Sequence, residues 1–553
     1  MTNRKRVVIL GAGFGGVYSG IYLEKLLGRS DDFDITLINR ENYFVFQPML
    51  AEVVSGNIGM LDTVSPIRRL LPKTDLHVRE IESIDLKNRT ITTTSGFRPA
   101  PHIVEYDHLV LALGNVTDFR GLTGLPEHAI PFKNLGDALY IRNHIIHVLE
   151  EAAIESGDAT LRRELLTFVV AGGGFSGVEV VAEINDFVRG VIGNYRSLDP
   201  RDVRIVLLQS SDRILPEVDE KLARFAERIL RKRGVEVVFD TRLQAATGNE
   251  AILACGTRIP TRTLISTVPS STHPLIGSLE LPKDQRGRIK TDSTLAVEGA
   301  ENVWAVGDCA MIPMADGSPS PPTAQFATRQ AKVVAHNIVA RIRGGDPKAF
   351  QFRELGKLGA LGRRSAVAQV FGINVSGFAA WWLWRSIYLM KLPGWGRRIK
   401  VAASWTLDLI LLPELVQLKL DDANHITHEH FEPGQTVFLQ GDLGDRIYII
   451  ASGEAEVIRT ENAQEVTLAR LGAGEYFGEM ALLNQTTRSA TVKCVRALDV
   501  LGIPKSEFSL LTSNLSVLRD SFQAISEQRK KATRDVISHD SMQTGFQLRE
   551  ANR

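Results

Sequence analysis

Cysteine is scarce in this chain of 553 residues, which contains three: Cys255, Cys309 and Cys494. They lie far apart in the sequence and form neither a C-x-x-C pair nor a zinc-binding pattern. An oxidoreductase that works by thiol–disulfide exchange needs a redox-active cysteine pair, so the spacing excludes that class. We therefore expect a reducing, cytosolic setting with no disulfide bond and no bound metal.

Three other features are missing. Lysine and arginine (65) balance aspartate and glutamate (64), and the resulting net charge of +1 argues against nucleic-acid binding by the chain as a whole. No uninterrupted apolar run has the length of a membrane-spanning helix. The few residues before the first apolar run leave no room for a signal peptide. A chain of this length needs more than one core, so we expect roughly three or four domains.

Two glycine-rich loops are the most informative features that are present. They are GAGFGG at residues 11–16 and GGGFSG at residues 172–177. Each follows an apolar run typical of a buried strand (6–10 and 168–171) and precedes a helix-like stretch. In that setting the glycines let the backbone approach a pyrophosphate, which lies at the helix N-terminus. Two such loops predict two dinucleotides, and hydride transfer between nicotinamide and flavin is the simplest chemistry that joins them.

The pattern around the loops predicts one nucleotide domain inserted into another. Further strands are expected at 34–38 and 106–114 after the first loop, and at 203–208 after the second. The segment WAVGD at 304–308 then returns to the first unit, and a proline-rich turn precedes a helix that begins at Thr323. We therefore predict an α/β fold with two Rossmann-like domains, each built on a parallel sheet.

Residues 355–407 differ sharply from the rest of the chain. They contain no Asp or Glu, but they hold eight Lys or Arg residues and five of the six tryptophans. Aromatic rings and cations together suit the headgroup layer of a membrane. Helical spacing places Lys400, Ser404 and Asp408 on one face, with an apolar face opposite formed by Ile399, Ala402, Ala403, Leu409 and Ile410. We favour a membrane-surface anchor; the alternative is a helical hairpin that packs on the protein's own core or on a dimer partner.

The chain up to about residue 415 resembles the type II, non-proton-pumping NADH:quinone oxidoreductases, which are flavoproteins with two dinucleotide-binding domains. The resemblance rests on the first glycine loop and on five further segments: NYFVFQP at 42–48, GFSGVE at 174–179, VGD at 306–308, PTAQ at 322–325 and LGRR at 361–364. It implies FAD in the first domain, NAD(P)H in the second, and membrane quinone as the electron acceptor.

The resemblance also assigns residues to the two cofactors. For FAD these are Gly11, Gly13, Phe14, Gly15, Gly16, Asn39, Arg40, Gly114, Gly307, Asp308, Ala324 and Gln325. For NAD(P)H they are Gly172, Gly174, Phe175, Ser176, Gly177, Glu179, Gln209 and Arg213. The glycines would hold the pyrophosphates, Asp308 the ribityl chain, and the helix that begins at Thr323 would direct its positive end at the flavin pyrimidine edge. Glu179, Gln47 and Gln325 are the candidate catalytic residues, although hydride transfer itself needs no general acid.

Three positions depart from the family pattern. Asn39 stands where an acid usually binds the adenosine ribose, and an amide can still bond the hydroxyls. Gln209 replaces the acid that repels a 2′-phosphate, and Ser210, Ser211 and Arg213 follow it, so we predict that NADPH is accepted. Arg329 stands where the quinone motif has its second glutamine, and a cation there would change the hydrogen bonding of the acceptor.

Residues from about 421 to 510 show short alternating runs separated by glycine turns, which predict an all-β domain. The segment FGEMALLNQTTRSAT at 477–491 resembles the phosphate-binding cassette of cyclic-nucleotide-binding domains. In that family, amides at the start of a short helix and an arginine meet the cyclic phosphate, and a glutamate takes the ribose 2′-hydroxyl. The resemblance assigns these roles to Gly478, Glu479, Ala481, Arg488 and Ser489. Serine rather than threonine after the arginine favours cAMP over cGMP.

These observations predict a peripheral FAD enzyme on the cytoplasmic face of the inner membrane, with NAD(P)H as donor, quinone as acceptor and a cyclic nucleotide as modulator. The alternatives are a soluble NAD(P)H diaphorase or ferredoxin-type reductase, in which the tryptophan-rich hairpin builds a homodimer, and a cyclic-nucleotide sensor with a vestigial flavin domain. The expected boundaries are 1–160 and 273–345 for the FAD-binding domain, 161–272 for the NAD(P)H-binding domain, 346–420 for a helical anchor, 421–510 for the cyclic-nucleotide-binding domain and 511–553 for a helical tail.

Overall fold

The structure is a computed structural model of the whole chain. It describes residues 4–27, 32–96, 100–119, 121–267, 271–407, 414–418, 427–461, 464–484, 487–505 and 507–509, together with residues 520, 522, 524, 525, 527, 529 and 531. The chain divides into two compact units: Met1–Thr90 with Glu105–Leu418, and Ile91–Val104 with Lys419–Arg553.

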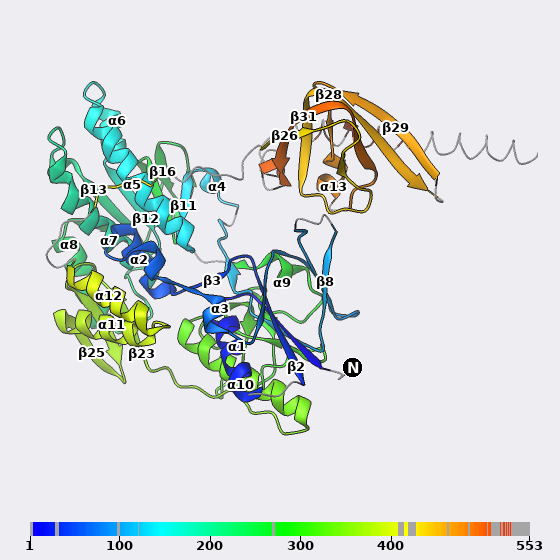
Figure 1. Cartoon of the computed structure of the whole chain (residues 1–553). Coiled ribbons are helices and arrows are strands. Elements are labelled where there is room, and N and C mark those ends of the chain that lie inside the picture. The colour runs from blue at the N-terminus through cyan, green and yellow to red at the C-terminus, as the bar shows by residue number, and fades with distance from the viewer. Residues whose placement is uncertain are drawn as a thin grey trace, which may run out of the picture. The chain divides into compact units, whose positions relative to one another are not determined.

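A five-stranded parallel sheet forms the centre of the first nucleotide domain. Its order is β21-β9-β1-β2-β5, with β1 (Lys5–Leu10), β2 (Phe33–Asn39), β5 (Asp75–Val78), β9 (His108–Leu111) and β21 (Val303–Ala305). Helices α1 (Phe14–Leu27) and α10 (Ala324–Arg343) pack against each other beside this sheet (Figure 1). Residues 7–10 are almost completely buried, as expected for a strand of a sheet that is covered on both faces.

A second five-stranded parallel sheet has the order β11-β18-β12-β13-β14. Its strands are β11 (Ala129–Pro131), β12 (Thr167–Ala171), β13 (Arg204–Leu208), β14 (Val235–Val238) and β18 (Thr263–Ser266), and its helices are α5 (Leu135–Ile154), α6 (Ala159–Leu165), α7 (Phe175–Val191) and α8 (Glu220–Lys232). Strand β21 and helix α10 follow this sheet in the sequence but belong to the first one. The predicted fold class, with one Rossmann-like domain inserted in the other, is therefore confirmed. Strand β11 precedes residue 161, so the second sheet draws its first strand from an earlier part of the chain than expected.

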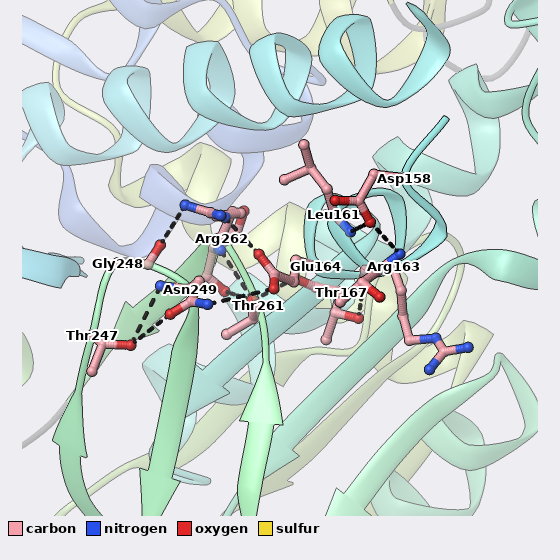
Figure 2. Close-up of polar contacts among 12 residues, drawn as sticks. Asp158, Leu161, Arg163, Glu164, Thr167, Thr247, Gly248, Asn249, Thr261 and Arg262 are labelled. Carbon is pink, nitrogen blue, oxygen red and sulfur yellow. Dashed lines mark hydrogen bonds and ion pairs between the residues drawn. The ribbon is translucent and has the colours of Figure 1, made fainter. Parts of the chain in front are cut away.

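Buried polar contacts hold β18 in register beside β12 (Figure 2). Glu164, at the end of α6, accepts a hydrogen bond from Arg262 Nε at 2.8 Å, and Thr261 Oγ1 donates to the Thr167 carbonyl at 2.5 Å. Arg262 also donates to the Gly248 carbonyl at 3.3 Å. Because Glu164 is buried, the ion pair offsets the cost of removing its charge from water. This side of the second sheet is thus fixed by residues that lie far from the glycine loop.

Residues 355–407 begin with a β-sheet rather than a helix. Strands β23 (Gly356–Ala360), β24 (Ala366–Val370) and β25 (Ile373–Gly377) form an antiparallel sheet, and helices α11 (Phe378–Lys391) and α12 (Trp395–Leu407) follow. In α12 the buried side chains are Val401 and Trp405, whereas Ile399 is 64% exposed. Ile399 therefore lies on the exposed side of the helix, where a membrane-surface anchor would have its apolar face; Asp408, Leu409 and Ile410 lie outside the described residues. Within the part of the chain that the structure describes, every helix is too short or too polar to cross a membrane.

The remaining elements are short helices and strands. They are β3 (Tyr43–Val45), η1 (Gln47–Met49), α2 (Leu50–Ser55), η2 (Met60–Asp62), β4 (Val64–Pro66), α3 (Ile67–Leu70), β6 (Ile81–Asp85), β7 (Thr90–Thr93), β8 (His102–Glu105), β10 (Asn115–Val116), α4 (Leu125–His128), η3 (Ile192–Asn194), η4 (Pro200–Asp202), β15 (Leu243–Ala246), β16 (Glu250–Leu253), β17 (Arg258–Pro260), β19 (Ser271–Thr272), α9 (Pro274–Ser278), β20 (Ile289–Lys290), η5 (Gly307–Cys309) and β22 (Ala310–Met311).

The C-terminal part of the second unit is an antiparallel β-structure, as predicted for its sequence. Its elements are β26 (Thr427–Phe431), β27 (Thr436–Phe438), β28 (Arg446–Glu461), β29 (Gln464–Gly472), β30 (Tyr476–Phe477), α13 (Glu479–Asn484) and β31 (Thr491–Pro504). Its core contains Ile450, Phe477, Leu498 and Val500. Most of the helical tail expected at 511–553 lies outside the described residues.

Candidate functional site

A cavity of about 620 Å³ lies where the carboxyl ends of the first parallel sheet meet. The loops after β1, β2, β9 and β21 all contribute to its wall, which is the position that ligands take in sheets of this kind. The residues assigned to FAD that line it are Gly11, Gly13, Phe14, Gly15, Asn39, Arg40, Gly114, Gly307, Asp308 and Ala324; Gln47 also lines it. Gly16 and Gln325 do not.

The first glycine loop leaves space for a ligand at Gly13, whereas a Cβ at any of its other glycines would meet neighbouring protein atoms. Gly11 has a φ of +94°, and a Cβ there would lie 2.5 Å from the Ala112 carbonyl oxygen. A Cβ on Gly16 would lie 1.8 Å from the Gly11 carbonyl oxygen, so Gly16 allows α1 to pack against the loop. A Cβ on Gly13, by contrast, would meet nothing within 4 Å. This open position at the start of a helix is the cradle that a pyrophosphate requires.

Two polar residues that the sequence did not reveal stand beside Asp308. Asn115 Nδ2 donates to Asp308 Oδ2 at 3.0 Å, and the Lys133 ammonium group donates to Asn115 Oδ1. Burial raises the pKa of Asp308, while the charge of Lys133 opposes the shift. Burial also lowers the pKa of Lys133. Both line the cavity, but no motif surrounds either one, and Asn115 lies 193 positions from Asp308 in the chain.

Helix α10 begins at this cavity. Thr323 and Ala324 line the wall, and no side chain caps the first turn, so its backbone amides stay available to a ligand with negative charge. Gln325 turns elsewhere: its Nε2 donates to Glu354 Oε1 at 3.1 Å and to the Gly356 carbonyl at 3.2 Å. One turn later, the Arg329 guanidinium lies 4.2 Å from the centre of the Phe352 ring.

The second glycine loop repeats this packing ahead of α7. Gly172 has a φ of +112°, and a Cβ on Gly177 would lie 1.7 Å from the Gly172 carbonyl oxygen. Gln209 Oε1, at the end of β13, accepts a hydrogen bond from the Gly173 amide at 2.9 Å. Gln209 Nε2 donates to Ser211 Oγ at 2.6 Å. The glutamine therefore connects the loop to the turn that, in this fold, faces the adenosine ribose.

A half-buried and a fully buried carboxylate follow the second loop along α7. Glu179, which the sequence singled out, accepts a hydrogen bond from the Ala360 amide at 3.0 Å, and burial raises its pKa to about 8. Glu183, one turn further on, is 3% exposed and accepts a hydrogen bond from Asn57 Nδ2 at 2.9 Å. Its pKa is also raised to about 8, chiefly by burial and then by the charge of Glu52. The sequence could have indicated Glu183 through its helical spacing from Glu179, but not its burial.

A separate cavity of about 460 Å³ lies within the second unit. All five residues assigned to a cyclic nucleotide line it: Gly478, Glu479, Ala481, Arg488 and Ser489. The Arg488 side chain donates to the carbonyls of Gly478 and Arg446, each at 2.8 Å, while its buried Nε makes no hydrogen bond within the described residues. Glu479 accepts a hydrogen bond from Arg529 Nη1 at 2.8 Å. Arg529 also lines the cavity, but it lies outside the cassette motif at 477–491, so the motif did not predict it.

Three family models match the chain. The pyridine nucleotide-disulphide oxidoreductase model matches residues 5–331, the NDH2 C-terminal domain matches residues 355–411, and the cyclic nucleotide-binding domain matches residues 428–514.

Proteins of similar sequence and structure support the same family. A probable NADH dehydrogenase of Dictyostelium discoideum is 32% identical over 412 residues, covering 73% of this chain and 90% of that protein. The type II NADH:quinone oxidoreductase NdhA of Mycobacterium tuberculosis is 32% identical over 421 residues, covering 73% and 86%. The solved structure of NDH2 from Plasmodium falciparum in complex with NADH has a TM-score of 0.69 at 19% identity, covering 75% of this chain and all of that one, which is a likeness of fold.

Proposed function

The chain belongs to the type II NADH:quinone oxidoreductases, and from this premise we propose that it is a peripheral membrane enzyme whose activity a cyclic nucleotide modulates. In this proposal it contains FAD, oxidises NAD(P)H and reduces membrane quinone without pumping protons. The observation that carries the proposal is the pair of glycine loops, each at the carboxyl end of its own parallel sheet. FAD, when bound, takes up a hydride from the nicotinamide and passes two electrons on.

The residues around the first cavity fit FAD. The open position at Gly13 would receive the pyrophosphate, and the Asp308 carboxylate would hold the ribityl hydroxyls. The uncapped N-terminus of α10 would stabilise negative charge on the flavin pyrimidine edge, which favours the reduced state. The second loop would position NAD(P)H, and Gln209 carries no charge to repel a 2′-phosphate, so we propose that NADPH is accepted beside NADH.

The exposed face of α11 and α12 supports docking on a membrane surface. On α12, Trp395 is 78% exposed and Ile399 is 64% exposed; on α11, Trp382 is 62% exposed. Half-buried Arg398, whose guanidinium carbon lies 5.6 Å from the centre of the Trp395 ring, and exposed Lys400 add positive charge to the same helix. Aromatic side chains combined with cations favour an interface that contains anionic lipid. We propose that this face lies on the cytoplasmic surface of the inner membrane.

Liposome flotation tests the membrane face. Full-length protein should float with anionic vesicles at moderate salt, and Trp395→Ser with Ile399→Ser should weaken flotation. Ile154→Ser is the matched control because Ile154 is 75% exposed on α5, outside this face, and it should float like the wild type. If the double variant floats unchanged but no longer dimerises, the face is a homodimer interface instead.

The cavity in the second unit supports an effector site. Arg488 presents a buried Nε with no partner among the described residues, which suits a phosphate oxygen, and Glu479 suits a ribose hydroxyl. We propose that this effector is a cyclic nucleotide, with cAMP favoured over cGMP. Modulation of turnover requires that the effector bind two conformations with different affinity.

Anaerobic reduction tests the function as a whole. The purified protein should show flavin absorbance, which NADH or NADPH should bleach, and a soluble quinone such as menadione should restore it. Adding cAMP should change the rate of one of these steps. A colourless protein would support the sensor with a vestigial flavin domain, and a flavin that quinone does not reoxidise would favour a soluble diaphorase.

A further inference from the structure

Three glutamates from two helices, two of them buried and one, Glu179, half-buried, come together behind the second glycine loop. Glu179 and Glu183 lie one turn apart on the same face of α7, and Glu52 comes from α2, which packs against α7. Glu183 and Glu52 are 3% and 4% exposed. The charge of Glu52 raises the pKa of both α7 glutamates, so the three carboxylates share one electrostatic environment.

One of the three carboxylates has a cation beside it. Glu52 accepts a hydrogen bond from Trp405 Nε1 at 2.9 Å, and its Oε1 lies 3.5 Å from Arg385 Nη2. The Arg385 guanidinium carbon lies 4.1 Å from the Trp381 ring centre and 4.6 Å from that of Trp405, which fixes the cation in place. Glu183 receives a hydrogen bond from the neutral Asn57 amide. Glu52 is therefore suited to hold the negative charge, and Glu183 to hold a proton.

The cluster lies next to a wall of the FAD cavity. Burial raises the pKa of Tyr388, and the negative charge of Glu179 adds to this shift, which indicates that Tyr388 lies near that carboxylate. The Tyr388 ring centre is 6.0 Å from that of Phe46, and the next residue, Gln47, lines the cavity. The described residues thus connect Glu183 through Glu179 and Tyr388 to the region where an acceptor would be reduced.

We propose that Glu183 is a positioning residue that stores a proton for reduction of the acceptor and acts through Glu179. This inference depends on the proposed function. In the overall reaction, NAD(P)H, one proton and quinone give NAD(P)⁺ and hydroquinone. The hydride supplies two electrons and one proton, and the quinone oxygens need two protons. Glu179 gives the second proton to the acceptor, Glu183 replaces it, and water then reprotonates Glu183.

The charges that face Glu183 support this role. Burial, Glu52 and Asp186 raise its pKa, while Ser55 and Arg385 oppose the shift. With the pKa at about 8, Glu183 is protonated at neutral pH and loses its proton in the mildly alkaline range. A carboxyl group that holds a proton at neutral pH can supply it without an added acid.

Two acceptors separate proton delivery from electron transfer. In anaerobic stopped-flow experiments, the full-length FAD-loaded protein is reduced with NADH and then mixed with menadione, which takes protons, or with ferricyanide, which takes none. With menadione, the wild-type rate should fall above about pH 8. Glu183→Gln should slow this arm by about 10- to 100-fold, the lower part of the range for proton-transfer catalysis. Ferricyanide should show neither effect, and Glu183→Asp should keep the pH dependence.

Infrared difference spectroscopy of the oxidised protein supplies a readout without turnover. A protonated carboxyl band should disappear near pH 8 in the wild type and be smaller by one carboxyl in Glu183→Gln. If the wild-type rates with the two acceptors depend on pH alike, or if Glu183→Gln slows both acceptors equally, the inference is overturned. Failure of NADH and NADPH to reduce the flavin at all would instead reject the proposed function.

Discussion

The pH dependence of stability tests the environment of Glu183 at equilibrium. In the unfolded chain this carboxyl has its ordinary pKa of 4.5, whereas in the folded protein burial raises the pKa to about 8. Between these values the folded state binds more protons than the unfolded state. The free energy of unfolding must therefore fall as the pH rises through this window, and the loss is complete above the folded pKa. Glu183→Gln removes the titrating group, so it should remove this part of the pH dependence.

The size of the effect follows from the shift. The interval from pH 6 to pH 8 lies inside the window, and each pH unit corresponds to about 1.4 kcal/mol for one group. Wild-type protein should therefore lose roughly 2–3 kcal/mol of unfolding free energy more than Glu183→Gln over this interval. At pH 6 the two proteins should differ by about 1.5 kcal/mol or less, because the glutamine oxygen can still accept the hydrogen bond from Asn57.

Urea unfolding followed by tryptophan fluorescence measures this difference. All six tryptophans lie in the first unit, so the signal reports the part of the chain that contains Glu183. Glu236→Gln is the matched control: it makes the same chemical change at an exposed pair with Arg204, 2.9 Å apart, which contributes about 0–1 kcal/mol. Its pH dependence should follow the wild type. If Glu183→Gln loses as much stability as the wild type between pH 6 and pH 8, the burial argument is refuted.

Four further substitutions test the loops and the effector cavity. Gly16→Ala places a Cβ 1.8 Å from the Gly11 carbonyl oxygen and should yield protein without flavin absorbance, whereas Gly13→Ala, where the Cβ meets nothing within 4 Å, should keep the fold but weaken FAD binding. Gln209→Glu should lower kcat/KM for NADPH by about tenfold or more, roughly 1.4 kcal/mol, and leave that for NADH nearly unchanged in steady-state assays. Arg488→Gln should weaken cAMP binding by about 10- to 100-fold in calorimetry, because a charge-assisted hydrogen bond is lost.

The two nucleotide domains could be predicted because local signals agreed with each other. Strand β12 is apolar from Phe168 to its end at Ala171, Gly172 follows it, and the next residues that fit a helix begin at Phe175. Gly172 is required by its positive φ and Gly177 by its contact with the Gly172 carbonyl, so both positions can be recognised in the sequence. The signals for strand, loop and helix therefore all supported the same assignment, a nucleotide domain.

Residues brought in from distant segments could not be predicted in this way. Lys133 reaches the FAD cavity from a loop without a motif, and Arg529 reaches Glu479 from 50 positions away. The strands β23–β25 were missed because the tryptophans and cations of residues 355–407 dominate the composition. Periodicity could not show which apolar side chains of α12 are buried, since Val401 and Trp405 pack inward whereas Ile399 is exposed.

The two departures at the strand ends have one structural explanation. Asn39 and Gln209 occupy the same position in the two sheets, and in each case the amide oxygen accepts a hydrogen bond from the glycine loop. The donors are the Ala12 amide at 3.0 Å and the Gly173 amide at 2.9 Å. A carboxylate would accept the same bond. Exchange of acid for amide therefore keeps this bond to each loop, while it changes the charge that the ligand meets and gives the side chain a donor.

The amide nitrogens distinguish the two sites. Asn39 Nδ2 donates to Glu41 Oε2 at 3.2 Å, and Glu41 lines the FAD cavity, so the first site keeps a carboxylate beside its ligand. Gln209 Nε2 donates to Ser211 Oγ at 2.6 Å and to the Arg213 carbonyl at 3.0 Å, which are neutral groups. Glu41 therefore supplies a negative charge beside the first loop, whereas the groups that the Gln209 amide nitrogen contacts beside the second loop are neutral. We therefore expect the chain to keep its affinity for FAD and to accept both NADH and NADPH, and the two properties should respond separately to mutation.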